Sequence, residues 1–183
     1  ELAPDFRVAV LDNGVAHNHL DLINNIWTNL GEIAGDGVDN DLNGYIDDVH
    51  GYNFDIPFET LYPPFPDHGT LVAGVIVAVG NNAIGVTGVN WRCKIVALKL
   101  LDEDVAGPWT SAAIEGMDYV MANGIKLSNH SWRTAFSQAL KVQIRRLEVF
   151  GHLLVAASGN AGKNVDAPPP AGESSPAGES SPV

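Results

Sequence analysis

The sequence predicts an α/β protein in which a parallel sheet carries helices on both faces. Apolar runs containing β-branched residues, typical of buried strands, occur at 7–12, 94–101, 125–130 and 152–158. Helical segments at 111–124 and 135–151 separate the last three runs. Because strands and helices alternate, crossover connections join neighbouring strands, which therefore run parallel.

Each element has a local justification. RVAVLD at 7–12 ends at an acid, whereas 13–67 is rich in Gly, Asn, Asp and Pro and is expected to be mostly loop. The apolar segment 69–79 predicts a buried helix directly after His68. For the helix at 111–124, Thr110 or Ser111 is the expected N-cap and Gly124 the closing residue. The helix at 135–151 is amphipathic and also ends at a Gly.

Composition predicts one ordered domain at 1–166, followed by a tail at 167–183. The length of 183 residues and the 45% hydrophobic content suffice for a core. The tail repeats AGESSP at 171–176 and 177–182. Because Pro, Ser, Gly and Glu bury little apolar surface, we expect the tail to be disordered.

The charge excludes several classes of function. A net charge of −12 argues against general nucleic-acid binding, which needs a basic face. No run of 18 apolar residues predicts a membrane span, and no basic-then-apolar leader is visible. Cys93 is the single cysteine, so no intrachain disulfide is expected.

Functional side chains are expected where the strands end. In parallel sheets such residues collect at the carboxyl edge, and Asp12, 102–104, Ser131 and Asn160 all fall at the carboxyl ends of predicted strands. Asp12 paired with His68 would fix the imidazole tautomer and make it a general base. The side-chain amide of Asn160 could stabilise an oxyanion. The residues alone leave a capping Asp and a structural His as alternatives.

An acidic loop predicts a calcium site. The stretch 8–91 contains eleven acids and no Lys or Arg. Within it, DNDLNGYIDD at 39–48 places oxygen donors as in the first half of an EF-hand loop, at Asp39, Asp41, Asn43, the Tyr45 carbonyl, Asp47 and Asp48. His50 replaces the bidentate Glu of that motif, and an Asx-rich turn without an ion is the alternative. Zinc is disfavoured, because the spacing of His17, His19, His50 and Cys93 matches no common zinc pattern.

Taken together, the motifs resemble the subtilisin family of serine endopeptidases, the subtilases. The resemblance covers roughly 6–166. The segments that carry it, in chain order, are VAVLDNGV (8–15), HLDL (19–22), DHGTLVAG (67–74), GNNAIGVTGVN (80–90), ALKLLDED (97–104), SNHSW (128–132) and VAASGNAG (155–162).

The resemblance implies a three-layer fold and roles for individual residues. Asp12 would be the triad acid, His68 the general base and Asn160 the oxyanion donor. A peptide substrate would bind as an extended strand along Val105, Ala106, Gly107, Ser131, Trp132 and Arg133, with Ala157, Ser158 and Gly159 lining the primary pocket. The family also implies export from the cytoplasm, and a propeptide or inhibitor as a partner.

The resemblance implies calcium as the cofactor and adds a second site. Its ligands would be the side chains of Asp21 and Asn82 and the carbonyls of Gly80, Ile84 and Val86. The N-terminal ligand of the family has no counterpart here, which should weaken this site. A Gly/Asn loop without an ion is the alternative.

The sequence also departs from the family pattern. The family's nucleophile lies several dozen residues beyond the oxyanion Asn, and the nearest strings here place Ser174 and Ser180 in the Pro-rich tail. Asn13 stands where the family has Thr or Ser, Leu71 where it has His, and Arg133 where it has Gly. We expect the change at Asn13 to be tolerated and the loss at Leu71 to be structural, because the replaced His is not the general base. Arg133 could obstruct substrate, and an exposed surface arginine is the alternative.

These departures predict an incomplete catalytic core. The 183-residue chain alone is expected to be inactive, because the triad acts as a unit. It should be marginally stable, calcium-dependent and prone to association through an uncovered sheet edge. A non-catalytic subtilase-like module that binds peptides or calcium is the alternative function.

Overall fold

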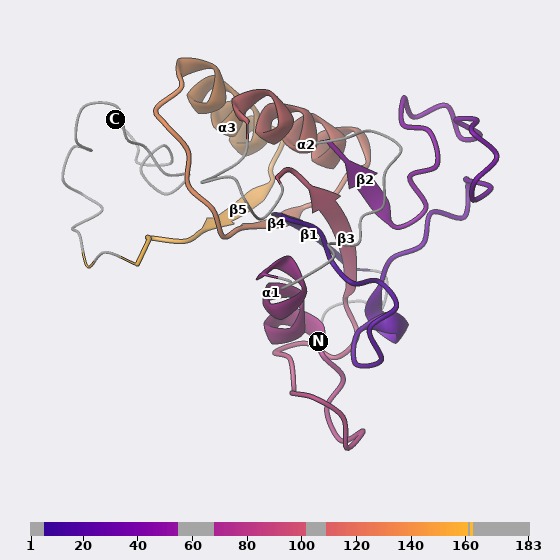
Figure 1. The fold of residues 1–183 in the computed structure, drawn as a ribbon. Coiled ribbons are helices and arrows are strands. Elements are labelled where there is room, and N and C mark those ends of the chain that lie inside the picture. Colours follow the sequence, from indigo (N-terminus) through magenta and orange to yellow (C-terminus); the bar gives the residue numbers. More distant parts are fainter. Residues whose placement is uncertain (1–5, 55–67, 102–108, 161, 163–183) are drawn as a thin grey trace.

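The computed structural model describes residues 6–54, 68–101, 109–160 and 162, which contain a five-stranded parallel sheet (Figure 1). The sheet order is β2-β3-β1-β4-β5. The strands are β1 (Arg7–Asp12), β2 (Gly51–Asn53), β3 (Lys94–Lys99), β4 (Leu127–His130) and β5 (Leu153–Ala156). The helices are η1 (Ile23–Asn25, 3-10), α1 (His68–Val77), α2 (Thr110–Ala122) and α3 (Gln138–Val149).

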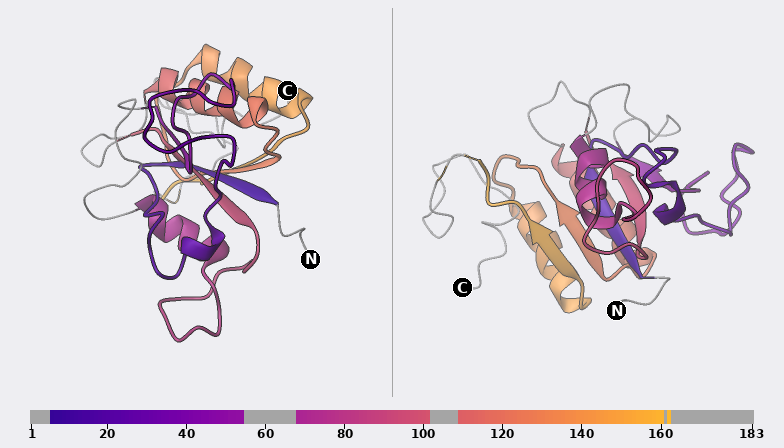
Figure 2. Two further views of the ribbon diagram at one scale, coloured as in Figure 1. Left: turned by 90° about the vertical axis from the view of Figure 1, so that its right-hand side faces the viewer. Right: turned by 90° about the horizontal axis from the view of Figure 1, so that it is seen from below.

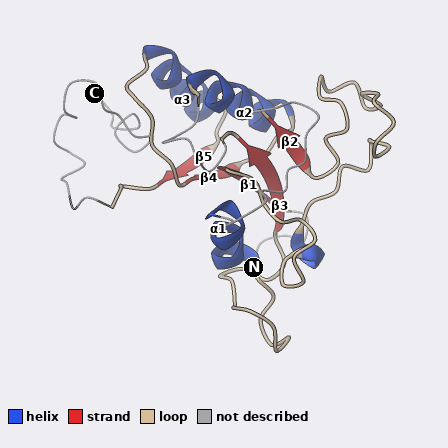
Figure 3. Cartoon of the chain, viewed as in Figure 1, coloured by secondary structure: helices blue, strands red, loops and turns tan. Residues whose placement is uncertain are grey.

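Helices cover both faces of the sheet, as the sequence predicts. Helices α2 and α3 pack side by side on one face, and α1 lies on the other (Figures 2 and 3). Alternate residues of β1 divide between the two cores. Ala9 and Leu11 join the α2/α3 side, and Val8 and Val10 join the α1 side. The two buried clusters therefore meet across β1, the central strand.

The short strand β2 was missed by the sequence prediction of loop over 13–67. It pairs with β3 in the register Gly51–Ala97 to Asn53–Lys99. With three residues, it is too short for an apolar period to reveal. Gly51 has φ +124°, and a Cβ there would lie 1.9 Å from the Ala97 carbonyl oxygen, so only glycine permits this pairing.

Of the two sequence predictions about the ends of helix α2, one needs correction. Helix α2 begins at Thr110, and the residue before it is Trp109, whose side chain makes no capping hydrogen bond. Thr110 and Ser111 are therefore not the N-cap. The predicted closing Gly is confirmed, because Gly124 follows the C-cap Asn123 with φ +64°.

Helix α1 is less buried than its apolar sequence predicts. Gly69, Ala73 and Val77 face the sheet, but Leu71 and Val75 are 69% and 64% exposed. A helix packed on one side of a sheet buries one stripe only, whatever its composition. The described helices are also all too short to cross a lipid bilayer.

Strand β5 forms the edge of the described sheet. It pairs with β4 in the register Leu127–Leu153 to His130–Ala156. Leu153 and Val155 are 62% and 48% exposed. Within the described ranges, this agrees with the expectation of an apolar edge.

A polar cluster lies beneath α3, between β4 and β5. Ser128 Oγ is 2.7 Å from the Nε2 atoms of both His130 and His152. His152 Nδ1 donates to the Ile125 carbonyl at 2.9 Å, so its Nε2 accepts the Ser128 hydroxyl proton. Burial lowers the pKa of His130 to about 3, and it also lowers the pKa of His152. Burial therefore favours the neutral form of both rings.

Acidification should destabilise the fold through this cluster. The folded pKa of His130, about 3, lies below its ordinary value of 6.5, so the unfolded chain binds the proton more readily. The contribution of the neutral histidine to the free energy of unfolding is fully present above pH 6.5, its ordinary pKa. Below that pH the free energy of unfolding falls by up to about 1.4 kcal/mol per pH unit for each such histidine. Urea unfolding at several pH values should show this loss, and His130→Leu should reduce the slope of the free energy of unfolding against pH. An unchanged slope in His130→Leu would contradict this assignment.

Candidate active site

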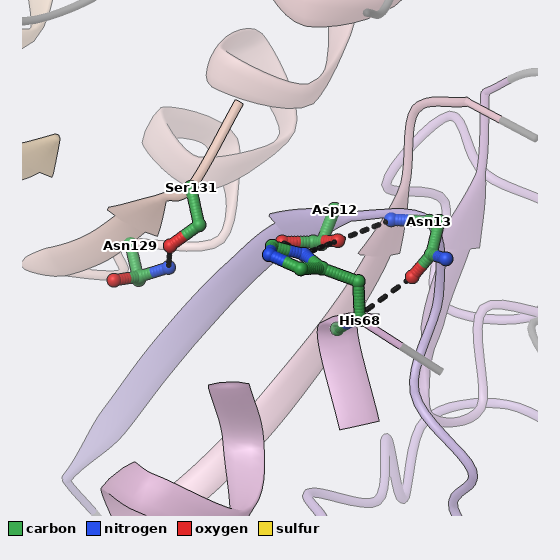
Figure 4. A network of polar contacts seen from close by, with 6 residues as sticks. Asp12, Asn13, His68, Asn129 and Ser131 are labelled. Atoms are coloured by element: carbon green, nitrogen blue, oxygen red, sulfur yellow. Dashed lines mark hydrogen bonds and ion pairs between the residues drawn. The ribbon is translucent and has the colours of Figure 1, made fainter. Parts of the chain in front are cut away.

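Asp12 and His68 form a hydrogen-bonded pair between the end of β1 and the start of α1. The Nδ1 atom of His68 lies 2.8 Å from Oδ1 and 3.0 Å from Oδ2 of Asp12 (Figure 4). The Asp12 side chain is 4% exposed and the His68 side chain 56% exposed. One ring edge is thus fixed against a buried carboxyl group, while much of the ring remains open to solvent.

The surroundings of Asp12 act on its charge in opposite directions. Burial raises the pKa of Asp12, whereas the hydrogen bonds from His68 and from the Asn13 backbone N–H oppose this rise. The Asn13 bond is 2.8 Å long. An ionised carboxylate accepts only, so it holds the His68 proton on Nδ1. The Nε2 atom of His68 is then the basic atom available to a third group.

A close approach of backbone segments brings the pair together. A Cβ at residue 69 would lie 2.2 Å from the Gly14 carbonyl oxygen and 3.0 Å from the Asp12 Cβ. Gly69 therefore allows the first turn of α1 to rest directly on the end of β1. Asn13 and Thr70 add side-chain hydrogen bonds across the same junction. Sequence reasoning assigned neither of them a role in the site.

The predicted substrate-contact residues lie partly at the same edge of the sheet. The register ends at Leu11–His130, so Asp12 and Ser131 follow one residue later on neighbouring strands. Ser131 accepts a hydrogen bond of 2.9 Å from the Asn129 amide (Figure 4). Trp132 is 8% exposed and packs in the α2/α3 core, and Arg133 is exposed.

The remaining predicted contacts follow β5 or lie outside the described residues. Ala157, Ser158, Gly159 and Asn160 are exposed, and the Ala157 N–H continues the ladder by donating to the His130 carbonyl. No hydrogen bond joins Asn160 to Asp12 or His68, all three of which are described. Val105, Ala106 and Gly107, like Ser174 and Ser180, lie outside the described residues.

The acidic loop gathers three carboxylates, one of which the sequence analysis did not single out. Oxygen atoms of Glu32, Asp39 and Asp41 lie within 4.8 Å of one another. Glu32 also accepts the backbone N–H groups of Asn40, Asp41 and Asp47 at 2.9–3.1 Å. Oxygen donors of this kind suit a hard cation such as Ca²⁺. The signal for Glu32 was its place in the cation-free acidic stretch, but its distance along the chain from 39–48 hid the contact.

The other predicted ligands in this loop have different surroundings. Asp48 is fully buried and accepts hydrogen bonds from Tyr119 Oη at 2.5 Å, Asn29 Nδ2 at 2.7 Å and Asn43 Nδ2 at 3.0 Å. Burial raises the pKa of Asp48, and these donors oppose the rise. Asp47 accepts the N–H groups of Gly35 and Gly37. The ring of Tyr45 packs edge-on against Tyr119, at a centroid distance of 4.7 Å.

The second predicted calcium loop also lies close to its predicted acid. Asp21 is 2% exposed. Its two carboxylate oxygens accept from Asn82 Nδ2 at 2.7 Å and from the Val86 N–H at 2.9 Å. These hydrogen bonds lower the pKa of Asp21, so it is held as a carboxylate. Gly80 and Ile84 belong to the same loop, and the Ile84 N–H donates to Asn82 Oδ1 at 3.0 Å.

Comparisons with known proteins identify the family of the chain. A sequence model of the subtilase family matches residues 4–180. Subtilisin-like protease 1 of Plasmodium berghei is 37% identical over 158 residues, which are 84% of this chain and 26% of that protein. The thermostable alkaline protease of Halalkalibacterium halodurans is 36% identical over 158 residues, which are 86% of this chain and 36% of that protein.

A solved structure shows the same fold at lower identity. The nisin leader peptidase NisP of Lactococcus lactis superposes with a TM-score of 0.64 at 21% identity, covering 90% of this chain and 46% of that one. The chain spans less than half the length of these relatives. The match over residues 4–180 nevertheless includes both Asp12 and His68. The chain therefore belongs to the subtilase family of serine proteases.

Proposed function

We propose that the chain carries the Asp–His pair of a subtilisin-type serine endopeptidase, with Asn160 as its oxyanion donor. The observation that carries the proposal is the hydrogen bond from His68 to both oxygens of the buried Asp12 carboxyl group. A surface histidine has no need of a buried acid, whereas a general base gains a fixed tautomer and a stabilised cation from it.

In this function His68 moves the proton. Its Nε2 atom would take the proton of a serine hydroxyl as the oxygen attacks the scissile carbonyl, and would then give it to the leaving amine. Asp12 would stabilise the intervening imidazolium, and the Asn160 amide would donate to the tetrahedral oxyanion. Water would then attack the acyl-enzyme. His68 would take the proton of the water and give it to the serine oxygen, which releases the acid product.

The proposed substrate is a peptide or protein bound as an extended strand. Ser131 and Ala157 follow the neighbouring parallel strands β4 and β5 at the edge of the sheet that carries Asp12. In this proposal the substrate backbone would pair with the chain there. The buried side chain of Trp132 favours a contact through its backbone. The proposed contacts are completed by Val105–Gly107 and Ala157–Gly159. The side chain of Arg133 would narrow the path by which the substrate reaches this edge of the sheet. By family resemblance, we also propose that the protein is exported from the cytoplasm and that a propeptide or an inhibitor binds to it.

Replacing His68 tests the proposed chemistry. In the protein as its source organism produces it, His68→Ala should lower kcat for an unstructured peptide by about 10⁴-fold or more, because the triad acts as a unit. Lys141→Ala, at an α3 residue far along the chain from the pair, is the matched control and should leave kcat unchanged. Hydrolysis that survives His68→Ala would contradict the proposal. Absence of hydrolysis in the wild type would favour a non-catalytic peptide- or calcium-binding module.

A separate labelling experiment tests whether the 183-residue chain contains the nucleophile. We propose that this chain alone has no reactive serine, so a fluorophosphonate probe should leave its intact mass unchanged in the presence of calcium. An adduct mapped to Ser174 or Ser180 and lost in His68→Ala would contradict that expectation. It would show that the tail supplies the nucleophile.

We also propose that calcium binds at two places, as it commonly does in subtilases: the acidic loop at 32–48, and the site formed by Asp21 with the loop at 80–86. In the first, Glu32, Asp39 and Asp41 would supply carboxylate oxygens. Asn43, whose side-chain amide donates to Asp41, and the Tyr45 carbonyl are the further proposed ligands. Asp47 and Asp48 are not part of this group of three carboxylates. In this proposal they would support the loop through the hydrogen bonds that they accept from the protein. In the second, Asp21 and Asn82 would act with the carbonyls of Gly80, Ile84 and Val86. Bound ions would offset the repulsion among clustered carboxylates.

Calcium should therefore raise the melting temperature of the chain relative to EDTA. Saturation about 100-fold above Kd adds about 2.7 kcal/mol of stability per site. Glu32→Gln should remove part of this gain and Asp21→Asn another part, whereas Glu148→Gln, at an exposed residue of α3, should leave it intact. A gain that is equal in all three variants, or absent from the wild type, would contradict the proposed sites.

A further inference from the structure

Asn13 follows Asp12 directly but contacts the other half of the pair. Its side chain is buried, and the residue is 4% exposed. The Oδ1 atom accepts the backbone N–H of Gly69 at 2.9 Å, across 56 positions of the sequence (Figure 4). The acceptor must be the amide oxygen, because the Gly69 N–H can only donate.

This hydrogen bond caps α1 from outside the helix. The N–H groups in the first turn of a helix have no partner within it, and they carry the positive end of the helix dipole. Gly69 is the second residue of α1 and follows His68 directly. Asn13 therefore satisfies a buried donor and fixes the backbone beside the histidine in one contact.

His68 depends on such a backbone anchor. With 56% of its side chain exposed, the ring gains little restraint from packing. The Ala16 N–H donates to Thr70 Oγ1 at 2.8 Å, which ties the same helical turn to the segment after β1 one residue further on. Of these two ties, the Asn13–Gly69 bond lies closer along the chain to both members of the pair.

We propose that Asn13 is a positioning residue for His68, holding the start of α1 so that Nδ1 stays within reach of both Asp12 oxygens. The inference rests on the proposed role of the Asp12–His68 pair and adds a residue to it. Asn13 acts through the Gly69 backbone, so its effect appears in the geometry of the histidine.

The test compares two substitutions of similar size in the full chain. Asn13→Leu removes the acceptor, and Asn13→Asp retains an oxygen at the same place. NMR of the His68 ring measures how fast the Nδ1-bound proton exchanges with water. Asn13→Leu should accelerate this exchange about tenfold, the factor expected from loss of one buried hydrogen bond. Asn13→Asp should exchange no faster than the wild type, because it keeps the acceptor and adds a negative charge beside the histidine.

Thr70→Val is the matched control, because it removes the other tie of the same turn. It should lower the melting temperature while leaving the exchange of the His68 proton near the wild-type rate. Should Asn13→Leu fail to fold, Asn13→Ala is measured in the same way. Wild-type exchange in a folded Asn13→Leu or Asn13→Ala variant, or equal acceleration in Thr70→Val, would overturn the inference alone. A wild-type chain without a protected Nδ1 proton would overturn the Asp12–His68 pair as well.

Discussion

The contact between the carboxyl end of β1 and the first turn of α1 holds the candidate site together. Gly69 permits the approach, and the Asp12–His68, Asn13–Gly69 and Ala16–Thr70 hydrogen bonds fasten it. Strand β1 can carry this contact because it is the central strand, buried between two cores. The position of the acid is therefore fixed by the sheet, and that of the base by a helix resting on it.

The same topology separates the site from the acidic loop. Strands β4 and β5 extend from one side of β1 and bring Ser131 and Ala157 to the edge that carries Asp12. Strands β3 and β2 extend from the other side, where the acidic loop leads into β2. Asp48 anchors that loop to α2 through Tyr119, so its conformation depends on the α2/α3 core. A bound cation would then stabilise the loop without taking part in the chemistry at His68.

What the sequence could predict was local. The apolar run and the β-branched residues of 7–12 placed Asp12 at a strand end, and the small-residue segment after His68 placed the histidine at a helix start. Strand β2, the approach of Glu32 to Asp39 and Asp41, and the contact of Asn13 with Gly69 depend on tertiary packing, which no window of sequence contains. The predicted N-cap of α2 was also wrong, because Trp109 precedes the helix and its side chain makes no capping hydrogen bond.

The tautomer of His68 tests the central claim most directly. Nitrogen NMR of the ring, recorded where the imidazole is neutral, reports which nitrogen carries the proton. The structure predicts a proton on Nδ1, facing the Asp12 carboxylate, and a bare Nε2 that can act as a base. A proton found on Nε2, with Nδ1 bare, would mean that Asp12 does not orient the histidine. The proposed proton transfer would then lose its structural basis.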